Sequence, residues 1–213
     1  MSGGVQLVVF DLGRVLCRIC DGWQHACTVA GVVAAAPAEP MPADACVQVH
    51  AAMCAHEVGD IDADAFARVA APHLGISVGD FLTIHDAYTR GPFDGAAALL
   101  DYLRAAGVAT ACLSNTNANH WRLMHEPGPA RMPMEKFDHR FASHLLRLRK
   151  PDERIYLHVE QATGVEPGRI VFFDDVEENV AASARRGWHA HRIAIDVDPV
   201  AQAREHLRRH GVL

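Results

Sequence analysis

Four short runs of residues predict the strands of a sheet. Each run is brief and is flanked by polar or turn-forming residues, and runs of consecutive apolar positions are typical of strands covered on both faces. The runs are Val5–Phe10, Val108–Leu113, Ile170–Phe173 and His189–Ile193. We therefore expect buried, parallel strands at these four places.

Helical patterns lie between the predicted strands. The stretch Ala96–Ala106 carries leucines at helical spacing and is followed by Gly107, a residue common at helix C-termini. Two further helices are predicted over Asp152–Thr163 and Glu177–Arg186, which are also followed by glycines. Strands that alternate with helices predict an α/β fold with a parallel sheet.

The region after the first strand interrupts this alternation. Residues 17–92 are rich in alanine and are expected to be helical, with helices over Asp62–Ala71 and Val78–Thr89. The sequence thus predicts an α/β core domain formed by residues 1–16 and 93–213, and a helical domain inserted over residues 17–92.

The charge balance narrows the possible partners of this fold. The chain has 213 residues and a formal net charge of −6. An acidic balance without a basic run argues against general nucleic-acid binding, which depends on neutralising phosphates. A small phosphorylated molecule needs only a few local donors and stays compatible. No stretch approaches the roughly 18 apolar residues of a membrane helix, so no membrane partner is expected.

The cysteines are expected to be free thiols. The first apolar run is short and is broken by Asp11 and Arg14, unlike a signal peptide, so we expect a cytoplasmic protein. Thiols stay reduced in that compartment. Cys17 and Cys20 form a CxxC pair, but no second CxxC accompanies it, so we expect small buried side chains rather than structural zinc or a redox site.

Polar residues follow three of the predicted strands. Asp11 comes after the first strand, Ser114 and Asn115 after the second, and Asp174 and Asp175 after the third. Ligands of an open parallel sheet bind beyond the carboxyl ends of its strands, so these side chains are expected to meet in one site. Adjacent carboxylates repel one another unless a cation lies beside them, so the aspartate pair favours a metal.

Four motifs resemble those of the haloacid dehalogenase-like (HAD) hydrolase superfamily, and most closely its alpha-D-glucose-1-phosphate phosphatase-like branch. They read FDLGRVL, LSNTNANH, RKPDERIY and FFDDVEENVAASARRG, and a fifth segment, HEVGDI at residues 56–61, resembles the helical cap of that branch. The resemblance implies a Rossmann-like parallel sheet flanked by helices, with a helical cap inserted after the first strand. It also implies hydrolysis of a small phosphorylated metabolite, for instance a sugar phosphate.

The resemblance assigns the reacting groups. Asp11 would attack phosphorus and form an aspartyl-phosphate, and Lys150 would neutralise the charge of Asp11 and of the phosphoryl group. Ser114 and Asn115 would bind phosphate oxygens, although either could instead be a helix N-cap.

The predicted cofactor is Mg²⁺, a hard cation that prefers oxygen ligands. The resemblance gives the side chains of Asp11 and Asp175 and the carbonyl of Gly13 as its ligands. Asp174 is a further ligand or an acceptor beside them, and Asn179 would orient this acidic loop.

Other positions leave alternatives open. His120 would either touch the substrate or pack where the cap meets the core. Arg14 could pair with Asp174, reach the phosphate or crowd the site. Glu57 and Gly59 are expected to shape a turn of the cap.

Gly13 departs from the pattern of most family phosphatases. They carry there a second aspartate, which protonates the leaving oxygen and then activates water, help that is typically worth ~10²–10⁴-fold. The glucose-1-phosphate phosphatase also has glycine at this place, so an anomeric or acyl phosphate that leaves easily is one explanation.

Three functions fit these observations. The first is a Mg²⁺-dependent phosphatase, with activity lowered by the glycine. The second is a metal-independent 2-haloacid dehalogenase, and the third is a catalytically weak phosphate-binding pseudophosphatase. The oligomeric state stays open.

Overall fold

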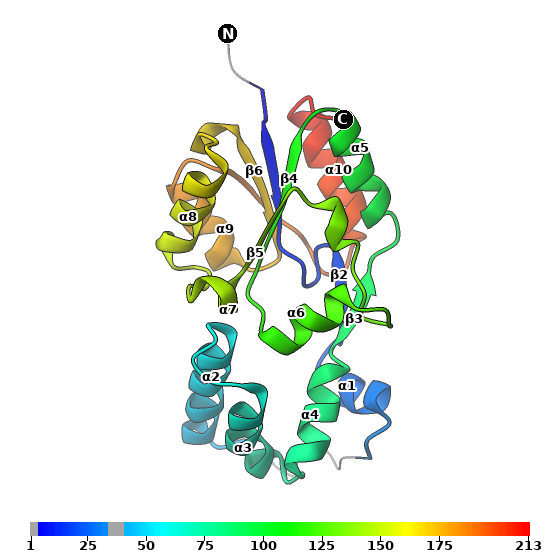
Figure 1. Cartoon of the computed structure of the whole chain (residues 1–213), viewed down its shortest axis with the longest axis vertical. Coiled ribbons are helices and arrows are strands. Elements are labelled where there is room, and N and C mark those ends of the chain that lie inside the picture. Colours follow the sequence, from blue (N-terminus) through cyan, green and yellow to red (C-terminus); the bar gives the residue numbers. More distant parts are fainter. Residues whose placement is uncertain (1–3, 34–40) are drawn as a thin grey trace.

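A five-stranded parallel sheet forms the centre of the molecule (Figure 1). The computed structural model describes residues 4–33 and 41–213. The strands, in the spatial order β5-β4-β1-β6-β7, are His139–Ala142, Ala109–Ser114, Leu7–Phe10, Ile170–Asp174 and His189–Arg192. All four pairs of neighbours run parallel.

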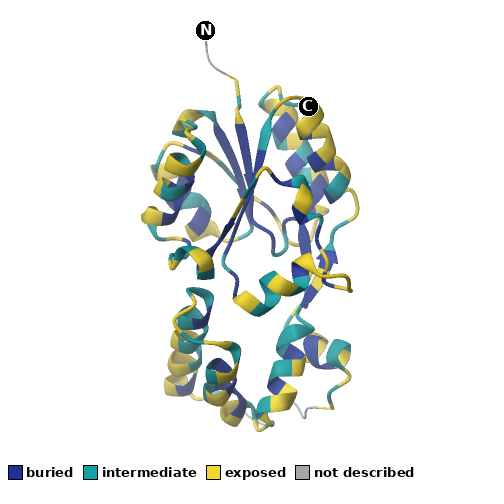
Figure 2. Ribbon diagram, in the orientation of Figure 1, coloured by how far each residue is buried: buried dark blue, intermediate teal, exposed yellow. Residues whose placement is uncertain are grey.

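Helices cover both faces of this sheet because its central strand is apolar on both sides. Leu7 and Val9 of β1 point into one core cluster, and Val8 and Phe10 point into the other; all four are fully buried. Figure 2 shows these buried strands between helices whose outer surfaces are exposed. The first cluster lies under α8 (Glu153–Thr163) and α9 (Glu177–Arg185), and the second under α5 (Ala96–Ala105) and α10 (Pro199–Arg209).

In the described part of the chain, four helices form an insert at the carboxyl end of the sheet, and we call them the helical insert (Figure 1). They are α1 (Trp23–Ala30), α2 (Ala43–Glu57), α3 (Ala63–Leu74) and α4 (Val78–Asp86). The chain enters and leaves the insert through an antiparallel pair, β2 (Cys17–Ile19) and β3 (Thr89–Pro92). Phe66 and Phe81 are buried at the centre of the insert, which therefore has an apolar cluster of its own.

Two helices lie between the sheet and the insert. They are α6 (Ala118–His125), which follows β4, and α7 (Ser143–Leu146), which follows β5. Single 3₁₀ turns occur at Met134–Lys136 and Pro167–Arg169.

The predicted strands are all present, with ends shifted by one or two residues. Strand β5 was not predicted because it is an edge strand of sequence HRFA, whose first two residues are polar. The prediction of a helix over Val78–Thr89 was wrong at its end. The helix stops at Asp86 because Thr89 already pairs with Ile19. Helix α10 was also missed.

The thiols are separate, as expected, but not all are buried. Cys17, Cys20, Cys27 and Cys112 are buried, whereas Cys46 is exposed and Cys54 is half-buried. Burial raises the pKa of Cys17 to about 12, so this thiol stays protonated at neutral pH. Within the described residues, every helix is too short or too polar to cross a bilayer.

Candidate active site

The ends of three adjacent strands bring the predicted site residues together. Strand β1 lies between β4 and β6. Asp11 directly follows β1, Ser114 is the last residue of β4 and Asp174 is the last of β6. The N–H of Asp11 donates to the carbonyl of Phe173 at 2.8 Å, which holds the first turn after β1 against β6. The expected convergence at the carboxyl edge is therefore observed.

Lys150 lies at the centre of the site. Its Nζ atom is 2.9 Å from Oδ1 of Asp11 and 2.6 Å from Oδ2 of Asp174. The side chain of Lys150 is 1% exposed. Burial alone lowers the pKa of Lys150, but the charges of Asp11 and Asp174 outweigh it and raise that pKa above its usual value. Lys150 is therefore a permanent positive charge.

Asp174 is held in place by several hydrogen bonds. Nδ2 of Asn179 lies 3.0 Å from both carboxylate oxygens of Asp174, and the N–H of Val176 donates to Oδ1 at 2.9 Å. The hydroxyl of Tyr156 donates in turn to the carbonyl of Asn179 at 3.1 Å. Both oxygens of Asp174 thus have partners within the protein, and this carboxylate positions Lys150.

Three carboxylates converge at this edge of the sheet. One oxygen each from Asp11, Asp174 and Asp175 can be chosen so that all three lie within 4.8 Å of one another. Burial raises the pKa of Asp11 to about 7 against the lowering effect of Lys150, and the charge of Asp174 raises it further. Burial and Asp174 likewise raise the pKa of Asp175. Burial is the largest cause of both shifts and the charge of Asp174 adds to it, so a cation bound beside these carboxylates would favour their ionised forms.

The donor set fits a small hard cation. Carboxylate and carbonyl oxygens are the ligands that Mg²⁺ prefers. Asp11, Gly13 and Asp175 line a cavity of about 280 Å³ at this edge of the sheet. The backbone hydrogen bonds of the turn use the carbonyls of Leu12 and Cys17 rather than that of Gly13. Asp11, Asp175 and the Gly13 carbonyl would therefore hold the ion.

Ser114 and Asn115, at the end of β4, were both expected to bind phosphate oxygens, and Asn115 has a different role. The side chain of Asn115 holds Lys150, because its Oδ1 accepts from the Lys150 N–H at 2.8 Å and its Nδ2 donates to the Lys150 carbonyl at 3.0 Å. Ser114 is buried and lines the cavity. The alternative that Ser114 or Asn115 caps the next helix is wrong, because Asn117 is the N-cap of α6.

Arg14 lies at the mouth of the site. It adopts a φ of 59°, in the left-handed region that few residues other than glycine occupy. Arg14 lines the same cavity of about 280 Å³ as Asp11 and Asp175. It does not pair with Asp174, whose oxygens are taken by Lys150 and Asn179; its charge instead lowers the pKa of Asp175, against the larger effect of burial.

His120 lies where the insert meets the sheet domain. Its ring stacks on that of His85 from α4, with centroids 4.1 Å apart, and its Nε2 donates to the His85 carbonyl at 2.7 Å. Burial, together with His85, lowers the pKa of His120 to about 3. The ring is therefore neutral and joins the two parts of the molecule.

Glu57 and Gly59, which were expected to shape a turn of the cap, attach the insert to the sheet domain, and Ser143 and Arg149, which were not predicted, are their partners or neighbours there. The carboxylate of Glu57 pairs with Arg149 at 2.8 Å, and the carbonyl of Glu57 accepts from the Ser143 hydroxyl at 2.5 Å. Gly59 has a φ of 75°, and a Cβ placed there would lie 2.9 Å from the carbonyl of His144. Arg149 adjoins Lys150 in the sequence, which is a weak signal; Ser143 gave none.

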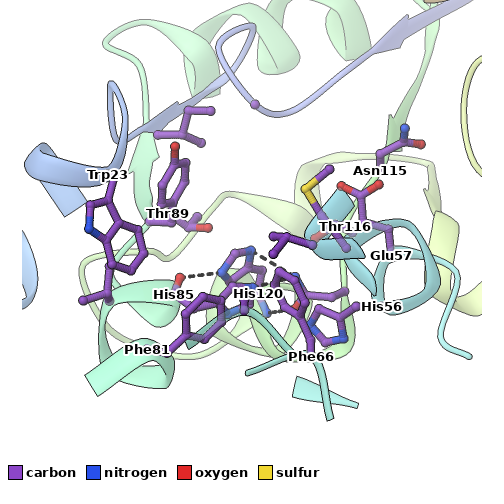
Figure 3. Close-up of a pocket in the computed structure, with 18 of the residues that line it drawn as sticks. Trp23, His56, Glu57, Phe66, Phe81, His85, Thr89, Asn115, Thr116 and His120 are labelled. Carbon is purple, nitrogen blue, oxygen red and sulfur yellow. Dashed lines mark hydrogen bonds between the residues drawn. The ribbon is translucent and has the colours of Figure 1, made fainter. Parts of the chain in front are cut away.

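A second cavity, of about 440 Å³, adjoins the site. Figure 3 shows Trp23 and Thr89 on one side of it, Glu57 and Asn115 on the other, and His85 and His120 between them. The lining comes from α1 to α4, from α6, from β2 and β3, and from the segments after β1 and β4. It combines residues far apart in the chain, so sequence spacing could not reveal it.

Comparison with known proteins agrees with this geometry. A family model described as haloacid dehalogenase-like hydrolase matches residues 5–187. The fold is similar to that of a HAD family enzyme from Bacteroides thetaiotaomicron, with 20% identity and a TM-score of 0.76 over 92% of this chain and 97% of that chain. Another structure of that enzyme is a complex with magnesium and inorganic phosphate, with a TM-score of 0.73.

Two further solved structures are similar. A predicted HAD-like family hydrolase from Porphyromonas gingivalis has 22% identity and a TM-score of 0.76, over 97% of this chain and 99% of that chain. The L-2-haloacid dehalogenase from Xanthobacter autotrophicus, with chloropropionic acid covalently bound, has 22% identity and a TM-score of 0.59, over 98% of this chain and 84% of that chain.

Proposed function

The chain belongs to the haloacid dehalogenase-like hydrolase family, and on this basis we propose that it is a Mg²⁺-dependent phosphatase of small phosphorylated metabolites. The observation that carries the proposal is the group formed by Asp11, Asp174 and Asp175, in which one oxygen of each carboxylate lies within 4.8 Å of the other two. A dehalogenase that works without metal has no need of this excess negative charge. The magnesium and phosphate bound to the Bacteroides enzyme support the same choice.

The residues divide the work of phosphoryl transfer. An oxygen of Asp11 attacks phosphorus as the bond from phosphorus to the leaving oxygen breaks, which gives an aspartyl-phosphate. Lys150 offsets the negative charge of both partners, and Ser114 donates a hydrogen bond to a phosphate oxygen. Water then hydrolyses the aspartyl-phosphate, releasing inorganic phosphate and restoring Asp11. A bound Mg²⁺ supplies further neutralisation of the transferred group.

Because of Gly13, the rate of the proposed reaction should depend strongly on the leaving group. It has no side chain that could protonate the departing oxygen, so the leaving group must be stable as an anion or nearly so. Substrates of this kind include acyl, anomeric and aryl phosphates. We propose that the helical insert serves as the cap that covers this reaction. The free thiols are consistent with the cytoplasm as its place.

The test compares the wild type with Asp11→Asn on a panel of phosphate esters, with Mg²⁺ and with EDTA. The proposal expects turnover in the wild type with Mg²⁺, and a loss of at least about 10³-fold in Asp11→Asn or in EDTA. Equal background turnover in both proteins would instead indicate a phosphate-binding pseudophosphatase.

A 2-haloacid dehalogenase is the second candidate function. Gly13 favours this function, because displacement of halide from carbon needs no general acid. The similarity to the Xanthobacter dehalogenase supports the same function. Release of chloride from 2-chloropropionate in EDTA, lost in Asp11→Asn, would establish this activity. The phosphatase proposal expects no such release.

A further inference from the structure

The second cavity continues directly from the cavity that contains Asp11. Both are lined by Gly13, Ile19, Glu57 and Ser114. A phosphate ester whose phosphorus faces Asp11 must therefore extend its organic group past these residues. The cavity volume of about 440 Å³ lies within the range of pockets that enclose small organic ligands.

Aromatic side chains form much of the cavity wall. Trp23 and Phe81 stack with centroids 6.1 Å apart, and Phe66 meets Phe81 edge-to-face at 5.2 Å. Among the lining residues that the structure describes, there is no lysine or arginine. The acidic residue in this lining, Glu57, is already paired with Arg149. The wall therefore matches an uncharged, flat organic group.

Two stacked histidines, His85 and His120, close this wall. Nδ2 of Asn117 can only donate, and it lies 3.2 Å from Nδ1 of His120, so this nitrogen accepts. Nε2 of His120 donates to the His85 carbonyl, which leaves the His120 ring uncharged. The stacked pair presents aromatic surface to the cavity (Figure 3).

Three buried polar atoms of the lining have no hydrogen-bond partner in the protein. They are Nδ1 of His85, Nε2 of His56 and Oγ1 of Thr116, and His56 and Thr116 are each 4% exposed. Nδ1 of His56 lies 3.1 Å from the Ile61 carbonyl and so donates, which leaves Nε2 as an acceptor. Leaving such groups unsatisfied is costly, and a hydroxyl on the ligand would satisfy them.

The chemistry at Gly13 points to the same class of ligand. The oxygen of a phenol-type leaving group departs as an anion more readily than an alkoxide does, because an aromatic hydroxyl has a pKa near 10. It therefore has less need of the acid that Gly13 lacks.

We infer that the second cavity binds the leaving group of the substrate, and that this group is an uncharged aromatic alcohol with a further hydroxyl, so that the substrate is an aryl phosphate. This inference rests on the proposed phosphatase function. A sugar would lose the water around several hydroxyls, and the cavity would offer in exchange three unpartnered polar atoms and an aromatic wall.

Kinetics on four substrates test the inference. With Mg²⁺, kcat/KM for 1-naphthyl phosphate is expected to exceed that for glucose 1-phosphate and for hexyl phosphate by about 100-fold or more. Acetyl phosphate is too small to fill the cavity, so its rate of hydrolysis measures phosphoryl transfer at Asp11 without a contribution from the cavity. Turnover of acetyl phosphate with equal or better use of glucose 1-phosphate would overturn the inference and leave the proposed function standing.

Matched tryptophan variants locate the effect. Trp23 lines the cavity and Trp121 of α6 does not, although both are half-buried. Trp23→Ala is expected to raise KM for 1-naphthyl phosphate about tenfold, with acetyl phosphate changed less than about twofold, and Trp121→Ala is expected to leave the ratio of the two substrates unchanged. Equal effects of the two variants would overturn the assignment of the cavity.

The unpartnered hydroxyl has its own test. Thr116→Val keeps the shape of the side chain, so kcat/KM for 1-naphthyl phosphate should stay within about twofold of the wild type. A dihydroxynaphthalene monophosphate should lose about tenfold. If this loss is missing for every position of the second hydroxyl, that part of the inference is wrong.

A binding measurement separates the cavity from the chemistry. If none of the phosphate esters is hydrolysed, acetyl phosphate included, the proposed function fails. Calorimetric titration of the wild type with 1-naphthol still tests the cavity: binding that Trp23→Ala weakens about tenfold and Trp121→Ala does not would support it, and absence of binding would overturn it.

Discussion

The ammonium group of Lys150 lies 2.9 Å from the carboxylate of Asp11, and the lysine side chain is 1% exposed. Water contributes little to the solvation of this lysine, so its charge depends on its carboxylate partners. Removing one member of such a buried pair leaves an uncompensated charge. The pair therefore links the stability of the fold to the proposed chemistry.

Lys150→Met tests this link, because the sequence contains one other lysine, Lys136, as a matched control. Without added divalent cation, Lys150→Met should lower the free energy of unfolding by about 3–5 kcal/mol, since Asp11 and Asp174 lose their counter-charge. Lys136 pairs with Asp101 at the surface, so Lys136→Met should cost at most about 1 kcal/mol. Urea denaturation at pH 7.5 measures both, and equal costs would contradict the prediction.

Gly13→Asp should restore the missing acid. A Cβ at Gly13 meets only side-chain atoms of Ile19, at 3.9 Å, so the backbone has room for a side chain. On hexyl phosphate, kcat should rise by about 10²-fold, because an alkoxide needs protonation as it leaves. Acetyl phosphate should change little.

Gly13→Asn is the control for this substitution. It has the size of aspartate but no acid, and should leave kcat on hexyl phosphate near the wild-type value. A rise of the same size in both variants would show that the gain does not come from proton transfer.

Gly59→Ala should loosen the attachment of the helical insert. A Cβ would lie 2.9 Å from the carbonyl of His144, in addition to the strain of a positive φ. Gly75 has a similar φ, 66°, with nothing within 4 Å of the added atom. Gly75→Ala should cost about 1 kcal/mol, and Gly59→Ala clearly more. Urea denaturation compares the two variants. Similar losses of unfolding free energy would mean that the backbone at His144 can move away from the added methyl group at little cost.

The stability of the protein should fall between pH 7.5 and pH 5, partly because of His120. The pKa of His120 is lowered to about 3 in the folded protein, from the ordinary histidine value of 6.5. Below pH 6.5, His120 is therefore protonated in the unfolded chain but stays neutral in the folded protein. The free energy of unfolding is highest above pH 6.5 and decreases as the pH falls below this value. The loss at pH 5 is about 2 kcal/mol.

A pair of variants isolates this contribution. His120→Gln should show a pH-dependent loss smaller than that of the wild type by about that amount, as measured by urea denaturation at the two pH values. His125 is exposed on the same helix, and His125→Gln should retain the wild-type slope. If His120→Gln keeps the full slope, the histidine does not govern it.

The sheet and its carboxyl edge were predictable because they depend on local order in the sequence. Strand β1 is apolar at every position and ends one residue before Asp11, and β6 ends at Asp174. A polar residue after a buried strand can point only to the edge where ligands bind. The edge strand β5 gave no such signal, because half of its residues are polar.

The aromatic cavity and the attachment of the insert could not be predicted in the same way. Trp23 of α1 and Phe81 of α4 are separated in the sequence by helices α2 and α3, and only the tertiary fold stacks them. Ser143 is an ordinary serine in the sequence, yet its hydroxyl accepts from the N–H of Thr116 and donates to the carbonyl of Glu57. Contacts of this kind follow from how elements pack, which no spacing along the chain records.

Strands β2 and β3 also have a consequence for protein engineering. Because Cys17 pairs with Pro92 and Ile19 with Thr89, the two points where the helical insert joins the rest of the chain are neighbours in space (Figure 1). The whole insert can therefore be treated as a cassette. A short hairpin could replace it, or the corresponding segment of a related hydrolase could be grafted onto the same two strands, with the sheet and its aspartates left untouched.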